Sequence, residues 1–178
     1  MKFNCIKIND LLLITSLLFL PACVNQHQNS FVDISFDEKP SLSFTGRGAA
    51  AGIMLDSVMV GGAAIGIAID QGIAKDISNN ILKQNPSFDF REFVRQQLTQ
   101  SQISSIESIK IKTWGFKSAP DDQVSAWLVL DVVKNRKSIQ VNYPEDFSAV
   151  KTENFMKVKE SSNIAINLLN NALSDIFK

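Results

Sequence analysis

The chain has 178 residues, of which 45% are hydrophobic and 20% are charged, which predicts one folded domain with its own core. Lysine plus arginine and aspartate plus glutamate are balanced at 18 each, so no excess of positive charge attracts nucleic acid, and we expect no nucleic-acid partner. Both cysteines, Cys5 and Cys23, and the single histidine, His27, precede the predicted domain. Because these residue types are the usual ligands of transition metals, we expect no metal site and no cofactor.

The first 22 residues have the order of a secretory signal. Lys2 and Lys7 precede a largely apolar run, Leu11 to Leu20, and small residues follow it. This run has about half the residues that a membrane-spanning helix needs, so we expect a cleaved signal rather than a membrane span.

The end of this signal, Leu20-Pro21-Ala22-Cys23, resembles the lipobox of bacterial lipoproteins. The resemblance implies cleavage by signal peptidase II between Ala22 and Cys23 and acylation of Cys23. Pro21 departs from the usual small or β-branched residue, whereas the other three residues fit. An ordinary cleaved signal is the alternative. Several acyl chains on one residue would hold the mature protein stably on a membrane.

The residues after Cys23 predict where the anchored protein resides. In Gram-negative bacteria an aspartate directly after the acylated cysteine commonly means retention at the inner membrane. Val24 stands there, which favours the outer membrane, with the domain facing the periplasm. Residues 25–30 are polar, so we interpret 23–30 as the acylated cysteine with a short tether, followed by a single domain over 31–178.

The domain begins with two short segments and a long apolar one. Residues 31–37 and 41–46 alternate loosely and are separated by Lys39-Pro40, which predicts two short strands, or one strand and an extended arm. The segment 48–83 is rich in Ala, Gly, Ile and Met and lacks proline. We expect it to form a helix, or a helical hairpin if it breaks at Gly61-Gly62.

The chain after Pro86 predicts a helix, three strands and a second helix. The stretch "DFREFVRQQL", which starts at Asp89, has a spacing close to a capping box and one apolar face, typical of a short amphipathic helix. Residues 107–116, 123–133 and 138–143 have strand patterns, and the last two should form a hairpin. An apolar stripe from Ala165 to Ile176 predicts a helix that packs across the sheet, with a cap at Ser161 or Ser162. The same stripe continues backwards, so a start of this helix as early as Glu153 is the alternative. We expect one core that contains Leu128, Leu130, Ile139, Val141, Leu169 and Leu173.

These elements predict an α+β fold with a small antiparallel sheet of about three to five strands. The sheet would pack with the glycine-rich helix or hairpin, the short amphipathic helix and the C-terminal helix. The element order after residue 87 resembles that of small periplasmic domains of lipoproteins in secretion and polysaccharide-export systems, such as the curli-secretion and Pel export lipoproteins. Since this resemblance rests on element order alone, it implies no function.

The glycines of the apolar segment are the candidate site for association. On a helical projection, Gly48, Gly52, Gly62 and Gly66 fall on one side, so another backbone could approach closely there, as in a helix-packing or oligomer face. The stretch from Ser57 to Ile69 lacks polar groups other than Ser57, which is short for a membrane span. Burial in the domain, an interface with another copy, and membrane insertion all remain open.

For two sets of residues in this region, a chemical role is the alternative to a structural one. Gly46, Gly48 and Gly52 stand between a predicted strand and a helix, where backbone amides can bind phosphate, although a tight turn into a closely packed helix explains the same glycines. Asp56 and Asp70 would be about 21 Å apart on a continuous helix, too far to act on one bond, so we interpret them as helix-end or packing residues.

The residues support no catalytic site, so we expect a non-enzymatic accessory or scaffolding lipoprotein of the outer membrane. It would bind an envelope protein or another copy of itself. Two alternatives remain. The first is a membrane-active or oligomer-forming protein that inserts Met54 to Ile73 into the bilayer, and the second is a hydrolase whose site the sequence does not mark.

Overall fold

The computed structural model describes residues 32–38, 41–48, 51, 54 and 62–178. The N-terminal signal, Cys23, the tether, Gly52 and Asp56 lie outside the described residues. The strands are β1 Asp33–Phe36, β2 Ser43–Thr45, β3 Ile106–Ser118, β4 Gln123–Lys134, β5 Lys137–Tyr143 and β6 Glu153–Asn154. The helices are α2 Gly62–Gln84, α3 Phe90–Gln97, α4 Gln100–Ile103, α5 Phe155–Glu160 and α6 Ser162–Ile176, with a 3₁₀ turn at Phe147–Ala149.

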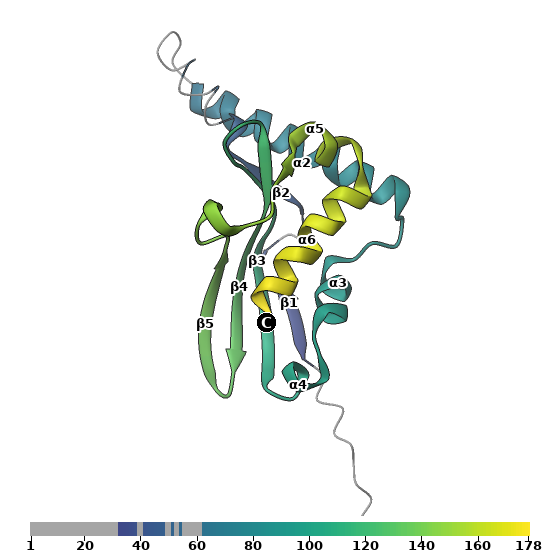
Figure 1. Ribbon diagram of the computed structural model, residues 1–178, viewed down its shortest axis with the longest axis vertical. Coiled ribbons are helices and arrows are strands. Elements are labelled where there is room, and N and C mark those ends of the chain that lie inside the picture. The colour runs from purple at the N-terminus through teal and green to yellow at the C-terminus, as the bar shows by residue number, and fades with distance from the viewer. Residues whose placement is uncertain (1–31, 39–40, 49–50, 52–53, 55–61) are drawn as a thin grey trace, which may run out of the picture.

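The fold is α+β, as predicted, but its sheet is mixed and larger than expected. β3, β4 and β5 follow one another as antiparallel neighbours (Figure 1). β1 and β2 both pair with β3 in parallel, and β6 pairs with β4, which makes six strands. The two short N-terminal segments are therefore both strands, and they join the sheet through long-range pairing.

The predicted hairpin of β4 and β5 is confirmed, and its turn shows why it forms. Asn135 and Arg136 are the two residues between the paired Lys134 and Lys137, and their φ angles are 51° and 61°. Two consecutive residues with positive φ make a type I′ turn, whose twist matches that of the flanking strands. Asparagine tolerates this conformation better than most residues.

One face of the sheet carries the core. Ile109, Ile111 and Phe116 of β3 are fully buried, and so are Leu128 and Leu130 of β4. A register shift between Ile111 and Thr113 brings Trp114 onto the same buried face, where it pairs with Leu128. Strand alternation, adjusted by this bulge, therefore directs the large apolar side chains toward the helices.

The helices cover this face of the sheet. α6 packs on β4 and against α2, and α2 also contacts β2 and α5 (Figure 1). α3 is the predicted amphipathic helix, and its N-cap Asp89 accepts hydrogen bonds from the backbone amides of Arg91 and Glu92. The backward extension of the C-terminal stripe is a separate short helix, α5, which Asn154 caps. Ser161 precedes α6 without a side-chain capping bond, while the Ser162 hydroxyl binds Gln84.

The predicted core is correct except at Ile139. Leu128, Leu130, Leu169 and Leu173 are fully buried, and Val141 packs partly buried against them. Ile139 is 53% exposed. β5 is the last strand in the sheet order, so a residue that faces the helix side can still lie beyond the helices that cover the centre.

Candidate functional site

The glycine-rich segment is folded back on itself. Residues 47, 48, 51 and 54 are helical, and α2 begins at Gly62. A Cβ atom at Gly48 would lie 1.8 Å from the carbonyl oxygen of Gly66. In one continuous helix these two residues would be about 27 Å apart. The described residues therefore exclude one continuous helix and fit the helical hairpin, whose connecting residues 55–61 lie outside the described part of the chain.

A buried carboxylate fixes the base of this hairpin. Asp70, on α2, is 9% exposed and accepts hydrogen bonds from the backbone amides of Gly48 at 2.6 Å and Gly46 at 3.0 Å. The first amides of a helix have no partner within the helix, so Asp70 serves as a cap from another segment. Gly46 has a φ of +117°, a conformation that side-chain-bearing residues rarely adopt. This turn aims both amides at one carboxylate.

The same bonds bear on the phosphate-binding alternative. Gly46 and Gly48 were the amides that could bind a phosphate, and both donate to Asp70. The carboxylate therefore occupies the place that an anion would need. The glycines serve a tight turn and a close approach between two segments of this chain.

Arg47 strengthens the contact between this turn and the rest of the domain. Its guanidinium lies 3.8 Å from the centre of the Phe155 ring and donates to Asp122 at 2.8 Å. Phe155 begins α5 and Asp122 lies in the turn before β4. The start of the hairpin is thus held from two sides.

Three of the four predicted packing glycines lie in the described residues, and all three are buried. Gly62 and Gly66 belong to the buried stripe of α2, which continues through Asp70 and Ala74. Gly48 packs onto Gly66. Within the described residues, this glycine contact is made inside one chain, so it is a packing face of the domain itself.

The side chains around the rest of the α2 N-terminal half are apolar and exposed. Ile65 is 40% exposed, Ile67 is 61% exposed and Ile69 is 37% exposed. At about 100° per residue, Ile65 and Ile69 lie on one flank of the buried stripe and Ile67 lies on the other. Residues 62–69 contain no polar side chain. This end of α2, which we call the apolar end, extends past the strands at the upper left of Figure 1.

Met54, on the other segment of the hairpin, is 74% exposed. Helices that are apolar on every side are normally enclosed by other apolar groups. Within the described residues, the apolar end is therefore our candidate surface for contact with another molecule.

Among the described residues, no helix combines the length and the apolarity needed to cross a membrane. In the same part of the chain, His, Cys, Asp and Glu side chains form no group of three that could hold a metal ion.

Comparisons with known proteins give no relative. No family model, no curated protein and no solved structure matches this chain.

Proposed function

We propose that this protein is a non-enzymatic lipoprotein, anchored through Cys23 at the outer membrane, that binds a protein partner or another copy of itself through the apolar end of α2. The observation that carries the proposal is the exposure of Ile65, Ile67 and Ile69 on a helix whose opposite side is fixed by Asp70. Contiguous exposed apolar surface commonly marks a site of association.

The main alternative is that the segment from Met54 to Ile73 enters the lipid bilayer. The exposed isoleucines suit this alternative as well. However, the segment contains two carboxylates, Asp56 and Asp70. Ionised side chains are costly inside a bilayer, so association with protein is the better explanation.

A charge at Ile67 tests the proposed surface. In Ile67→Glu we expect the melting temperature to stay near that of wild type, because the side chain is mostly exposed and such changes usually alter stability by less than about 0.5 kcal/mol. We expect adducts with a partner, or with a second copy, to disappear from chemically crosslinked envelopes. Gln71→Glu places the same charge at an exposed polar position of α2 and should leave them intact.

Three results would count against the proposal. Adducts that persist in Ile67→Glu would contradict it, and so would adducts that are lost equally in Gln71→Glu. Flotation of a soluble form, lacking the signal and carrying Cys23→Ser, with lipid vesicles would favour bilayer insertion, provided that Ile67→Glu abolishes the flotation.

The anchor has its own test. We expect cells supplied with a labelled fatty acid to label the wild-type protein but not Cys23→Ser, and Met1 to Ala22 to be absent from the mature chain. Equal labelling of the two proteins would contradict the lipoprotein assignment without affecting the proposal for α2.

A further inference from the structure

A pocket separate from the apolar end lies where α2, α3 and the sheet meet. Its volume is about 200 Å³. Ser78 and Leu82 of α2 line it from one side, Phe36 of β1 and Trp114 of β3 from the sheet, and Phe88 from the loop before α3. A cavity of about 150 Å³ with apolar walls is large enough to bind benzene, so this pocket has room for one ring and a small substituent.

The pocket has aromatic walls in a fixed arrangement. Trp114 stacks on Phe90 with ring centroids 4.3 Å apart and an interplanar angle of 10°. Phe88 lies 6.2 Å from Trp114 and is tilted by 37°. Because these rings are packed against one another, they form a preformed aromatic wall of the pocket, and a planar aromatic group is the shape that packs best against such a wall.

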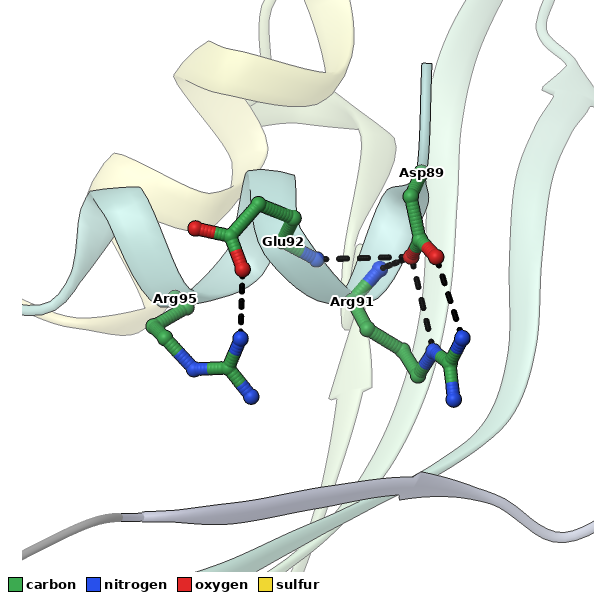
Figure 2. Close-up of polar contacts among 4 residues, drawn as sticks. All are labelled: Asp89, Arg91, Glu92 and Arg95. Atoms are coloured by element: carbon green, nitrogen blue, oxygen red, sulfur yellow. Dashed lines mark hydrogen bonds and ion pairs between the residues drawn. The ribbon is translucent and has the colours of Figure 1, made fainter. Parts of the chain in front are cut away.

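Charged groups line the pocket beside the aromatic rings. Arg91 and Asp89 both border it, and Figure 2 shows their side chains turned toward each other. The guanidinium donates to the carboxylate through Nη2 at 3.0 Å and Nε at 3.4 Å. The hydrogen bond from Arg91 lowers the pKa of Asp89 below its ordinary value, so the carboxylate is ionised at neutral pH.

Arg91 keeps binding capacity beyond this pair. A guanidinium has five N–H donors, and Asp89 accepts from two of its nitrogens, which leaves donors for a second carboxylate. The neighbouring Glu92 is paired with Arg95, one turn further along α3 (Figure 2). Arg91 is therefore the cationic group that an anion in this pocket would meet.

We propose that this pocket binds a small aromatic carboxylate, with the ring against the aromatic wall and the carboxylate beside the Arg91 guanidinium. An aromatic pocket can also bind a quaternary ammonium ion. A cation would face Arg91, whose remaining N–H donors suit an anion, so Arg91 favours the carboxylate. The site is independent of the proposed function of α2.

The proposed binding is tested by titrating the purified full-length protein with benzoate. Calorimetry and ligand-observed NMR measure the binding. We expect saturable binding of benzoate, weaker binding of benzamide, which keeps the ring and an oxygen but lacks the charge, and no binding of choline. Ser78→Phe should abolish binding by filling the pocket.

Two charge variants at the pocket have opposite expected signs. Arg91→Gln should weaken benzoate binding about fivefold to tenfold, because it removes a charge-assisted hydrogen bond. Asp89→Asn should strengthen it severalfold, because the like charge disappears while asparagine still caps α3. Both side chains are substantially exposed, so both variants should fold.

The proposal is overturned if benzoate does not bind, if choline binds in its place, if Ser78→Phe binds benzoate as wild type does, or if Arg91→Gln and Asp89→Asn change the affinity in the same direction.

Discussion

At the scale of single residues, Asp70 determines how the two segments of the hairpin meet. Its carboxylate is buried and accepts from two backbone amides that belong to the segment before it. The arrangement needs glycine at position 48, because a Cβ atom there would also come within 3.0 Å of the Asp70 side chain. A polar group within an apolar helix thus has a structural partner 22 residues away.

Removal of this carboxylate should lower the stability of the domain. In Asp70→Ala two backbone amides lose their acceptor, so we expect a loss of about 1 to 3 kcal/mol in the free energy of unfolding, measured by urea denaturation. Asp70→Asn, which keeps one acceptor oxygen, should lose less.

Asp76→Ala is the matched control for this change. Asp76 lies on the same helix and forms a surface ion pair with Lys159 at 2.9 Å, so its removal should cost less than about 1 kcal/mol. If Asp70→Ala were no less stable than Asp76→Ala, the claim that the hydrogen bonds to Asp70 stabilise the domain would be contradicted.

Only part of this residue-level picture is readable in the sequence. The glycine spacing indicated close packing, and Asp70 was interpreted as a helix-end or packing residue. Its partners could not be predicted, because they depend on where the chain reverses. The aromatic pocket was also not predicted, since Phe36, Phe88 and Trp114 lie far apart in the sequence. They meet only in the folded chain, where β1 pairs in parallel with β3 and Phe88 packs against Trp114.

At the scale of elements, two glycines of the apolar region should respond oppositely to the same change. Gly48→Ala forces a methyl group into the Gly66 carbonyl, and overpacking typically costs about 1 to 3 kcal/mol. Gly72→Ala meets no atom within 4 Å and should stabilise α2 by up to about 1 kcal/mol through helix propensity. Thermal unfolding of both variants measures the difference.

A larger residue at Gly66 extends this test. Gly66→Leu should destabilise the domain despite its gain in helix propensity, because Gly66 is buried against Gly48. The packing role of the glycines would be contradicted if Gly48→Ala and Gly72→Ala had the same effect, or if Gly66→Leu left stability unchanged.

The predictability of the elements follows the range of the contacts that define them. α3, the hairpin of β4 and β5, and the C-terminal helix have local signals in their periodicity and caps, and the sequence predicted them. The parallel pairing of β1 and β2 with β3 depends on residues more than 70 positions apart, and no local pattern specifies it. Ile139 was placed in the core because alternation reveals a face of a strand but not whether a helix covers it.

At the scale of the whole molecule, the protein would combine a membrane anchor with an association surface. The proposed tether, residues 23–30, is short and would keep the domain close to the membrane. β1, which follows the tether, pairs with the start of β3, whereas Gly46, at the base of the hairpin, lies beside Ser118 at the other end of β3. The apolar end of α2 therefore lies at the end of the sheet away from the tether (Figure 1), where an envelope protein or a second copy can meet it. The pocket beside α3 uses other residues and would serve a small ligand.

Site-specific photo-crosslinking is the measurement that tests the association surface most directly. A photoreactive residue in place of Ile67 should give adducts with protein in intact envelopes, whereas one in place of Lys75, which is exposed on the same helix but outside the apolar end, should not. We expect a discrete protein adduct at position 67 only. Adducts with lipid alone at position 67, or equal protein adducts from both positions, would contradict the proposed association surface.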